Sequence, residues 1–469
     1  MFAKTVIKYS SMKKRFDYDY IIIGSGPAGT AAALNLAKSS RLRIAIVESG
    51  KLGGSYVNGR DLPYDVALGF AHSLNSIARG GKTGLAGADM HFNYPTTMYH
   101  RESIIKKISN DLRTNLKAAG ITIIEGLANF LDANRIAVGE YQYSAKRFII
   151  ATGAKTVSNI SGVTMMDYLT PETALGIKRL PRVVCVVGGG PAGCETAQYF
   201  AELGVKTILL ELTDRLLPRE DTEAGTILND YFTDELGITV LTNARAVAIR
   251  RDEISDCVIF SQNGQEKMVR VEAIVIATGS EPNVDLGLEN AGVKYKYTGI
   301  TVDSRFKTTA KNIWAIGDVI GGESSTDLAN YQGAYLAQHL AKHVNNLPNY
   351  DGFARVTRTF PCIATVGANE DDMCRLGRKY NESTVFLPIA AASMTKDFGR
   401  GFVKILTDKN GLVIGATIAA PGAEDLIQEL ALAVSARMNI TKLANAPHLN
   451  NTFSIVIRVA AKQLASKIR

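Results

Sequence analysis

Short runs of apolar residues, each followed by a glycine-rich turn, form the most regular pattern along the chain. The first run, residues 19–23, leads into a turn at residues 24–29 and then into the alanine-rich segment 30–37. A β-rich run, a tight turn and a strong helix former in this order predict a strand, a turn and a helix. Because the same order returns later in the chain, the pattern indicates an α/β fold.

The turn of the first unit has the glycine spacing of a dinucleotide-binding turn. Gly24 permits the tight turn, Gly26 lets the backbone approach a pyrophosphate, and Gly29 lets the helix pack closely on the strand. The N-terminus of the helix offers free N–H groups to the anion. The next apolar run ends in Glu48, where a carboxylate can accept hydrogen bonds from ribose hydroxyls. The first unit is therefore predicted to bind a dinucleotide.

The second unit begins with the apolar run 182–187 and the turn 188–195. Its second strand, residues 207–210, ends in Glu211. A carboxylate at this place repels the 2′-phosphate of NADP, which favours NADH as the nucleotide. Arg215 follows shortly after, so NADPH stays open as the less favoured alternative.

Two further strand-and-turn units, residues 148–153 and 274–279, are nearly identical and bracket the second dinucleotide unit. Each could be no more than a buried strand that ends in a glycine turn. Their likeness and placement favour two crossings of the chain between a first domain and an inserted one.

Composition and charge narrow the class of protein. The 469 residues suffice for several domains, and 46% apolar with 21% charged residues is the balance of a folded globular chain. The formal charge of +8 is spread along the chain without a basic run interleaved with aromatics, so no nucleic-acid partner is expected. The five cysteines lack CxxC spacing and the six histidines are scattered, so neither a disulfide framework nor a metal site is expected. No uninterrupted apolar run is long enough to predict a membrane span.

The N-terminal segment bears on localisation. Residues 1–16 carry five basic side chains and no acidic one, which faintly resembles an organelle transit segment. The stronger interpretation is a cytoplasmic protein that begins at Met12, with the preceding residues as a loose extension. The cysteine pattern, which indicates a reducing compartment, favours the same localisation.

With these units in place, the chain resembles the pyridine nucleotide-disulfide oxidoreductase family over nearly all of residues 19–454. Residues 313–318 resemble the family's second FAD signature, and residues 361–367, 401–404 and 423–427 resemble its C-terminal interface domain. The resemblance implies FAD on the first unit, a nicotinamide nucleotide on the second, and a homodimer. It also implies an α/β fold with two Rossmann-like dinucleotide-binding domains and an α+β dimerisation domain.

The resemblance further divides the chain and assigns residues to the cofactors. The expected domains are residues 1–155 and 281–348 for FAD, 156–280 for NAD, and 349–469 for dimerisation. FAD is expected to lie against Gly24, Gly26, Pro27, Ala28, Gly29, Glu48, Ser49, Gly54, Ser55, Ala128, Ala151, Thr152, Gly153, Asp318, Leu328 and Ala329. NADH is expected to lie against Gly188, Gly190, Pro191, Ala192, Gly193, Glu195, Glu211, Thr278 and Gly279.

The redox loop of the family reads GGTCxNxGCxPSK, and residues 53–65 keep its frame without its chemistry. Tyr56 and Asp61 stand where the two cysteines belong, and Asp65 stands where a lysine near the flavin belongs. A disulfide stores two electrons and exchanges them through a thiolate, a role that neither a phenol nor a carboxylate can fill.

The C-terminal motif of the family has lost the same reaction. Asn450 replaces the catalytic histidine, and Ile455 replaces the glutamate that orients it. Asparagine cannot titrate, so the pair that moves protons on and off the interchange thiol is absent. Two separated segments therefore indicate the loss of one whole half-reaction.

The replacing residues are candidates for catalysis, and each has a structural alternative. His448 is a replacement base only if it points into the cleft, and otherwise is a structural or surface histidine. Asp61 could instead cap the helix that contains Pro63. Tyr56 could be a packing residue, or a lid or stacking platform for a flat acceptor.

The change to Asp65 also alters the charge expected near the flavin. The family's lysine is often paired with the glutamate that Glu195 matches. Carboxylates near the ring would disfavour the anionic reduced flavin, an effect that Arg60 could offset. An aspartate that is buried without a partner would have a raised pKa and could donate a proton to the acceptor.

These observations predict an FAD-dependent NADH oxidoreductase of diaphorase type. It would pass electrons from FAD directly to a small acceptor such as a quinone, without a dithiol relay. The alternative from another class is a sensor or structural dimer that binds both cofactors without turnover. Pyridine nucleotide transhydrogenation and metal-ion reduction are lesser alternatives. An open apolar slot beside the flavin would favour quinones, and an acidic slot would favour metal cations.

Overall fold

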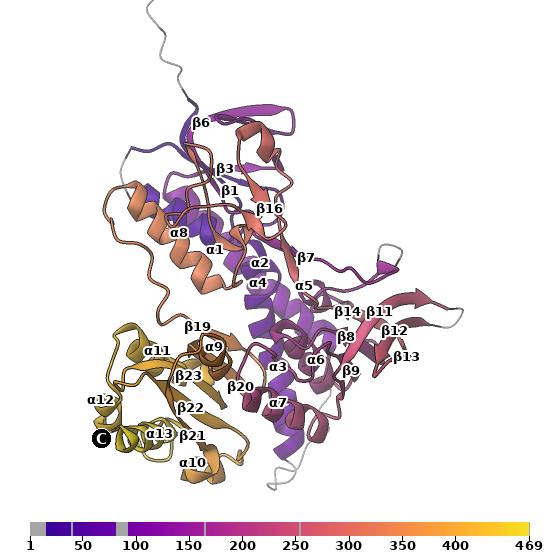
Figure 1. The fold of residues 1–469 in the computed structure, drawn as a ribbon. Coiled ribbons are helices and arrows are strands. Elements are labelled where there is room, and N and C mark those ends of the chain that lie inside the picture. Colours follow the sequence, from indigo (N-terminus) through magenta and orange to yellow (C-terminus); the bar gives the residue numbers. More distant parts are fainter. Residues whose placement is uncertain (1–15, 39–40, 81–91, 164–165, 253–254, 469) are drawn as a thin grey trace, which may run out of the picture.

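The computed structural model of the protein describes residues 16–38, 41–80, 92–163, 166–252 and 255–468. The transit-like segment at residues 1–16 therefore lies outside the described residues except for Phe16. The chain forms three lobes, and in Figure 1 the C-terminal lobe, coloured yellow, stands apart from the first, indigo and orange lobe. No helix of the described part is long and apolar enough to cross a membrane.

The first lobe is built on a parallel sheet. Its strands lie in the order β3 (Thr122–Glu125), β2 (Ile44–Glu48), β1 (Tyr18–Ile23), β6 (Tyr141–Ile150) and β18 (Ile313–Ala315). The first half of β6 continues into an antiparallel meander with β5 (Arg135–Val138) and β4 (Ala128–Asp132). Both faces of this sheet are covered, in keeping with the apolar residues 20–23 of its central strand.

Side-chain alternation along β1 supplies two cores. Tyr20 and Ile22 pack on the face covered by α1 (Pro27–Ala37) and α8 (Thr326–Leu340). Ile21 and Ile23 pack on the opposite face with the meander. Helix α1 begins three residues before the predicted start, because the fixed φ of a proline suits the first helical position.

Three further helices follow β2 in the first part of the chain. They are α2 (Gly54–Asn58), α3 (Asp61–Gly80) and α4 (Tyr94–Ala118). Helix α3 leaves the first lobe and reaches the second, where Tyr64, Ala67 and Leu68 are buried in one core with the second sheet. Helix α3 therefore links α2, which carries Tyr56, to the second lobe.

The second lobe repeats the parallel pattern on a smaller scale. Its strands lie in the order β10 (Thr239–Leu241), β9 (Lys206–Leu210), β8 (Val183–Val187) and β14 (Ala273–Ile276). Helices α5 (Pro171–Ala174), α6 (Pro191–Glu202) and α7 (Thr222–Asp234) belong to this lobe, as does an antiparallel sheet of β11 (Ala244–Arg251), β12 (Asp256–Gln262) and β13 (Gln265–Val271).

The segments that join the first two lobes lie against each other. Strands β7 (Ala154–Thr156) and β15 (Ser280–Pro282) pair antiparallel directly after the two similar strand-and-turn units. Short elements follow before β18, namely η3 (Leu288–Ala291), β16 (Tyr295–Lys296) and β17 (Gly299–Ile300), and η4 (Gly317–Ile320) comes after it. The numerical domain boundaries at residues 155, 280 and 348 remain a prediction.

The third lobe is an antiparallel sheet with helices. Its strands lie in the order β19 (Ala354–Thr357), β20 (Cys362–Gly367), β23 (Val413–Ala420), β22 (Phe402–Thr407) and β21 (Asn381–Phe386). Its helices are α9 (Glu370–Arg375), η5 (Leu387–Ile389), α10 (Ala391–Thr395), α11 (Ala423–Ser435), α12 (Ile440–Asn445) and α13 (Ser454–Lys467).

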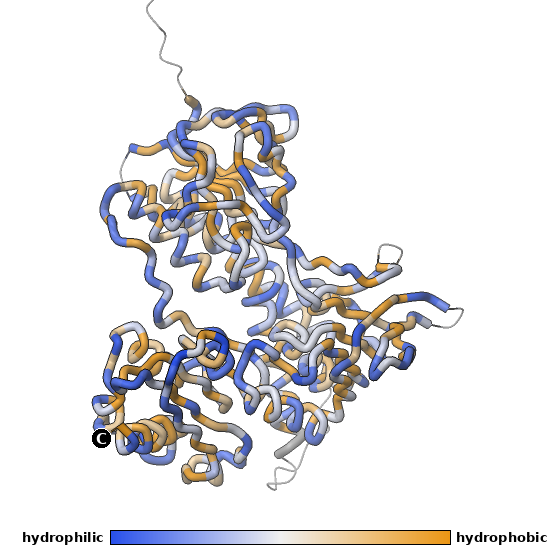
Figure 2. Tube along the Cα trace, viewed as in Figure 1, coloured by the Kyte–Doolittle hydropathy of each residue, from blue (hydrophilic) through white to orange (hydrophobic). Residues whose placement is uncertain are grey.

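The two faces of the third sheet have different partners. One face packs on α11 and α13 in a core of its own. The other face sends Ile363, Phe402 and Ala419 into the core that α3 and α6 share. Figure 2 shows the hydrophobic residues concentrated inside the lobes, with hydrophilic residues frequent on their outer loops. The fold is thus mixed α/β, with two parallel sheets and an α+β C-terminal unit.

Candidate functional site

One large cleft runs between the three lobes. It has a volume of about 1920 Å³ and is lined by both glycine turns as well as by residues of the C-terminal lobe. This volume exceeds the roughly 300–1,000 Å³ of an ordinary small-molecule pocket, so the cleft has room for more than one ligand.

The first glycine turn has the shape that a dinucleotide pyrophosphate requires. Gly24 has φ +104°, and a Cβ there would lie 2.2 Å from the carbonyl oxygen of Ala151. A Cβ on Gly29 would lie 2.0 Å from the Gly24 carbonyl oxygen, whereas one on Gly26 would meet nothing within 4 Å. The outer glycines therefore serve packing, and Gly26 leaves its backbone open to a ligand.

Glu48 completes the first half of the cleft at the end of β2. Its Oε2 accepts hydrogen bonds from the Ser25 backbone N–H at 2.9 Å and from the Ser25 hydroxyl at 2.6 Å. Its Oε1 accepts one from the Gly50 N–H at 2.8 Å. These bonds fix the carboxylate beside the glycine turn, where it can also face a ribose.

The second glycine turn repeats the first in detail. A Cβ on Gly188 would lie 2.5 Å from the Ala277 carbonyl oxygen, and one on Gly193 would lie 1.7 Å from the Gly188 carbonyl oxygen. Gly190 is open, with nothing within 4 Å of its Cβ position. The two turns therefore fit the same class of ligand.

Glu211 directly follows β9, much as Glu48 closes β2, and its side chain is buried. Its Oε2 accepts a hydrogen bond from the Gly189 N–H at 2.5 Å, and its Oε1 accepts bonds from the N–H and hydroxyl of Thr213 at 2.7 and 2.8 Å. Arg215 turns to Asp371, with Nη2 2.7 Å from Oδ2, and it does not line the cleft. The second site thus presents a carboxylate, and its nearby arginine is engaged elsewhere.

Most residues predicted for the cofactors line this cleft. On the FAD side these are Gly24, Gly26, Pro27, Ala28, Glu48, Ser49, Gly54, Ser55, Ala128, Ala151, Thr152, Gly153, Asp318 and Ala329. On the nucleotide side they are Gly188, Gly190, Pro191, Ala192, Glu195, Glu211, Thr278 and Gly279. Gly29, Gly193 and Leu328 are not part of the lining; the two glycines act through packing, and Leu328 lies in the first turn of α8.

The altered redox loop forms a charged wall. Asp61 is the first residue of α3, and its Oδ2 accepts a hydrogen bond from the Thr326 hydroxyl at 2.8 Å. Arg358 lies between the two aspartates, with Nη1 3.6 Å from Asp61 Oδ1 and Nε 3.0 Å from Asp65 Oδ1. Asp61 and Arg358 line the cleft, whereas Asp65 is not part of its lining. Neither aspartate is a buried acid without a partner.

Tyr56 is half-buried beside this wall. Burial raises the pKa of its phenol, and the charges of Asp61 and Asp65 raise it further. Burial also raises the pKa of Asp65, an effect that Arg358 opposes without cancelling. Tyr56 does not line the cleft, so its predicted role as a lid or stacking platform remains a prediction.

Glu195 connects this wall to the second glycine turn. Its side chain is buried on α6, and its Oε1 accepts a hydrogen bond from the Arg358 backbone N–H at 2.8 Å. Burial raises the pKa of Glu195, while the charge of Arg60 and the bond from Arg358 lower it in part. Arg60 also lines the cleft. Near the position where the family has a lysine, this chain thus has two other positive charges, Arg60 and Arg358.

His448 and Asn450 lie away from this wall in the single chain. His448 Nε2 is 3.0 Å from Glu429 Oε1, and its Nδ1 is 3.1 Å from the Ala446 carbonyl oxygen. Asn450 is exposed. Neither residue lines the cleft of its own chain, so His448 does not meet the stated condition for a base there. A role at a partner's cleft in the homodimer remains a prediction.

Sequence reasoning did not single out Arg358 or Thr326. Arg358 stands alone between β19 and β20, and Thr326 begins α8, far along the chain from Asp61. No local spacing joins these residues to the loop at residues 53–65. The one signal that the sequence offers for Arg358 is its positive charge between the segments that form β19 and β20.

The five cysteines lie outside the cleft lining, and all are free. Burial raises the pKa of Cys185 to about 12 and holds the pKa of Cys194 and Cys362 well above the ordinary value. A thiol with a raised pKa is a poor nucleophile at neutral pH. Cys374 is the exposed cysteine, and it is not part of the lining, although its neighbour Arg375 is.

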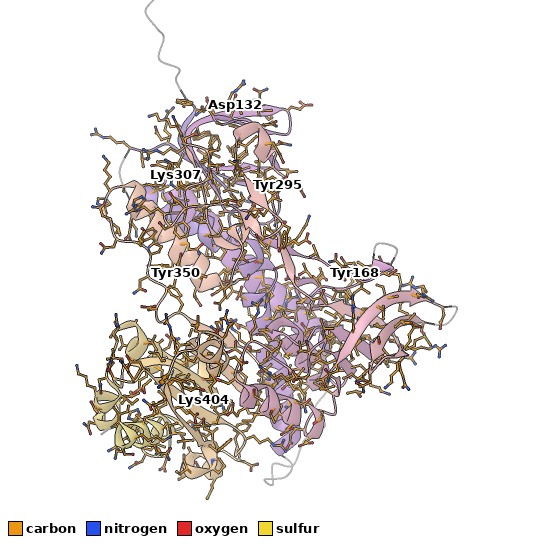
Figure 3. All side chains as sticks on the ribbon, viewed as in Figure 1. Asp132, Tyr168, Tyr295, Lys307, Tyr350 and Lys404 are labelled. Atoms are coloured by element: carbon orange, nitrogen blue, oxygen red, sulfur yellow. The ribbon has the colours of Figure 1, made fainter. Side chains whose placement is uncertain are left out.

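Three carboxylates of the described residues come close enough to hold a metal ion, although no metal site was expected. They are Asp221, Glu223 and Glu370. The ammonium of Lys404 already occupies the space among them: Nζ lies 2.8 Å from Glu223, 3.6 Å from Asp221, and in contact with Glu370. Figure 3 labels Lys404 within the C-terminal lobe. The lysine supplies the positive charge, so the cluster is a buried ion network.

Comparison with known proteins identifies the class that this fold and cleft define. Residues 18–335 match the family model described as pyridine nucleotide-disulphide oxidoreductase. Residues 353–461 match the dimerisation domain of the same family. The chain therefore belongs to the pyridine nucleotide-disulphide oxidoreductases, whose members bind FAD and NAD(P), and the second match supports a homodimer.

Individual relatives agree with this assignment. The chain is 32% identical to the mercuric reductase of Bacillus cereus over 92% of this chain and 70% of that protein. It is 30% identical to the mercuric reductase of Streptomyces lividans, over 96% and 97% of the two chains. It is 28% identical to the dihydrolipoyl dehydrogenase of Bacillus subtilis, over 95% and 96%. The crystal structure of LpdA from Mycobacterium tuberculosis superposes with a TM-score of 0.85 at 26% identity, over 95% and 99%.

Proposed function

We propose that this protein is an FAD-dependent NADH oxidoreductase of diaphorase type, which reduces a small acceptor such as a quinone without a dithiol relay. FAD, when bound, supplies the two-electron chemistry that links a hydride donor to the acceptor. The chain supplies two open glycine turns, at Gly26 and Gly190, in one cleft. Binding both cofactors there would bring them together.

The observation that carries the proposal is the wall formed by Asp61, Asp65 and Arg358. Of the two positions that hold thiols in the family, one carries Asp61, which is ion-paired with Arg358, and the other carries Tyr56. No cysteine lines the cleft, and the buried cysteines have raised pKa values. Because disulfide exchange needs an accessible thiolate, this arrangement supports an acceptor that is reduced directly.

The preference for NADH rests on Glu211. Its buried carboxylate is fixed by bonds from Gly189 and Thr213 at the end of β9. A 2′-phosphate placed there would face this negative charge, and Arg215, the arginine that follows it in the sequence, is paired with Asp371. We therefore propose NADH as the preferred nucleotide.

Metal-ion reduction is the second candidate, and the charge of the wall favours it. The wall is polar, with Asp61 in the cleft lining and Asp65 paired with Arg358 next to it. An apolar quinone gains little from such a surface, whereas a cation is attracted to it. The two candidates differ in salt dependence, because screening weakens attraction between charged partners only.

The test uses the purified protein with bound FAD, mixed with NADH in the absence of oxygen. We expect the flavin absorbance to bleach and to return when a quinone, ferricyanide or a divalent metal salt is added. Turnover with the best of these acceptors should exceed turnover with lipoamide or glutathione disulfide by at least about tenfold. Repeating the assay at two ionic strengths separates a cationic acceptor from a neutral one.

Three outcomes would contradict the proposal. Failure of NADH to bleach the flavin would remove the first half-reaction. Disulfide turnover as fast as the other activities would restore the dithiol relay by some other route. A protein that is reduced once and then stalls with every acceptor would be a sensor or structural dimer.

A further inference from the structure

Arg358 is held in place by groups from two other elements. Its guanidinium contacts Asp61 and Asp65 on α3, and its backbone N–H donates to Glu195 on α6. The two aspartates are four residues apart on one helix, so they lie on the same face and can both reach one cation. The side chain of Arg358 is 40% exposed and lines the cleft.

The charges around this position are unbalanced without the arginine. Burial lowers the pKa of Arg358, but the carboxylates of Asp65, Glu195 and Asp61, together with Cys362, hold it above the ordinary value. Arg60 is the other arginine that acts on Glu195. Without the charge of Arg358, the carboxylates of Asp61 and Asp65 would lose the cation that pairs with them, and negative charge on a ligand nearby would be disfavoured.

We propose that Arg358 supplies the positive charge that the altered loop lacks beside the flavin, and that Asp61 and Asp65 position its guanidinium. Arg358, a residue of the C-terminal lobe, then takes over the charge that the family's lysine carries in the loop. Arg358 thereby favours negative charge on bound FAD when it is reduced and raises its reduction potential. This inference rests on the part of the proposed function in which FAD occupies the first site.

The test measures the reduction potential of bound FAD in Arg358→Gln and Arg358→Lys. We expect Arg358→Gln to lower the equilibrium constant for flavin reduction by about tenfold, which is about 30 mV for a two-electron couple. Arg358→Lys keeps the charge, so the equilibrium constant for flavin reduction should stay within about twofold of the wild-type value. A purely structural role would not make the potential follow charge in this way.

Arg400 offers a matched control. Its side chain is 39% exposed, and its guanidinium lies 2.9 Å from Asp234 and 3.8 Å from Glu235, so it is also flanked by two acids. It does not line the cleft. Arg400→Gln should therefore leave the flavin potential unchanged, although it removes a comparable surface ion pair.

A double variant, Asp61→Asn with Asp65→Asn, covers the case in which Arg358→Gln does not fold. It removes the two acids that pair with the Arg358 side chain, so Arg358→Gln added to it leaves neither of them unpaired, and we expect this triple variant to have an equilibrium constant for flavin reduction about tenfold below that of the double variant. The inference is overturned if FAD binds and the potential is the same in Arg358→Gln as in the wild type, or, where Arg358→Gln does not fold, the same in the triple variant as in the double variant, a result that leaves the proposed function standing. A protein that binds no FAD overturns both.

Discussion

At the scale of single residues, the two glycine turns separate packing from binding. Gly24 and Gly29 lie so close to neighbouring carbonyl oxygens that any side chain would displace backbone, whereas Gly26 faces open space. The same holds for Gly190 in the second turn, where nothing lies within 4 Å of a Cβ. One residue type in one motif therefore has two physical reasons for its presence.

Gly26→Ala should leave folding intact and weaken FAD binding. A methyl group at this position meets no protein atom but blocks the approach of a pyrophosphate to the backbone. Alanine at this helix N-cap costs about 1 kcal/mol of stability. The smaller conformational freedom of alanine in the unfolded chain stabilises the fold by about 1 kcal/mol, so the two effects nearly cancel. Fluorescence titration should show FAD affinity reduced by at least about tenfold, with the melting temperature of the apoprotein nearly unchanged.

Two substitutions serve as controls for this prediction. Gly29→Ala should instead destabilise the fold by about 3 kcal/mol, because its Cβ would overlap the Gly24 carbonyl. Gly190→Ala should weaken NADH binding while FAD affinity is retained. Equal effects of Gly26→Ala and Gly190→Ala on both ligands would contradict the assignment of the two turns.

At the scale of elements, strand β1 is fixed at its entry by charged contacts. Asp19 Oδ2 accepts a hydrogen bond from the Arg43 N–H at 2.9 Å, and Oδ1 lies 2.7 Å from Lys146 Nζ. Arg43 precedes β2 and Lys146 belongs to β6, so one carboxylate ties the central strand to both neighbours. Burial raises the pKa of Asp19, but the contacts with Lys146 and Arg43 lower it more, and the net pKa lies below 3.8.

Asp19→Asn should destabilise the protein at neutral pH by about 0.5–1 kcal/mol, since it removes a charge-assisted contact at a partly exposed site. A group with a depressed folded-state pKa contributes stability above its unfolded pKa and loses it as pH falls through the folded value. The difference in melting temperature between Asp19→Asn and the wild type should therefore shrink below about pH 4. Asp351→Asn, at an exposed site, is the control. A gap that stays constant down to pH 3 would count against the ion pair.

At the scale of the whole molecule, Lys404 connects the C-terminal lobe to the second lobe. The lysine is on β22, fully buried, and its carboxylate partners Glu223 and Glu370 belong to α7 and α9. Burial lowers the pKa of Lys404, but its hydrogen bonds with the carboxylates raise it by more, so the ammonium remains charged. A buried network of this kind is costly to break, because the remaining charges lose their partner.

Lys404→Met should lower stability by about 3–5 kcal/mol, because it leaves three carboxylates close together without a cation. The measurement is the melting temperature, with Lys442→Met at an exposed position as the control. Adding Glu223→Gln and Glu370→Gln to Lys404→Met should recover part of the loss. A melting temperature equal to that of the control would show that the network contributes nothing to holding the lobes.

Several elements could be read from the sequence because the signals are local. The runs that became β1, β2, β8 and β9 are nearly all apolar, which buried parallel strands require. The prolines at the starts of α1 and α6 shifted both helix starts upstream of the expected positions, since they begin the helix inside the glycine turn. The altered thiol positions were also readable, because the frame of the loop survives around them.

What the sequence determined by itself, then, is the pair of dinucleotide turns, the acids that follow them and the absence of sulfur from the redox loop. Each depends on residues within about one βαβ unit, where spacing along the chain fixes spacing in space. Only the tertiary structure placed Arg358 between Asp61 and Asp65, and Lys404 among its three acids. Apart from Glu370, which shares the lobe of Lys404, these acids lie outside the C-terminal lobe that supplies the two cations, so their contact is set by how the lobes pack rather than by any local pattern.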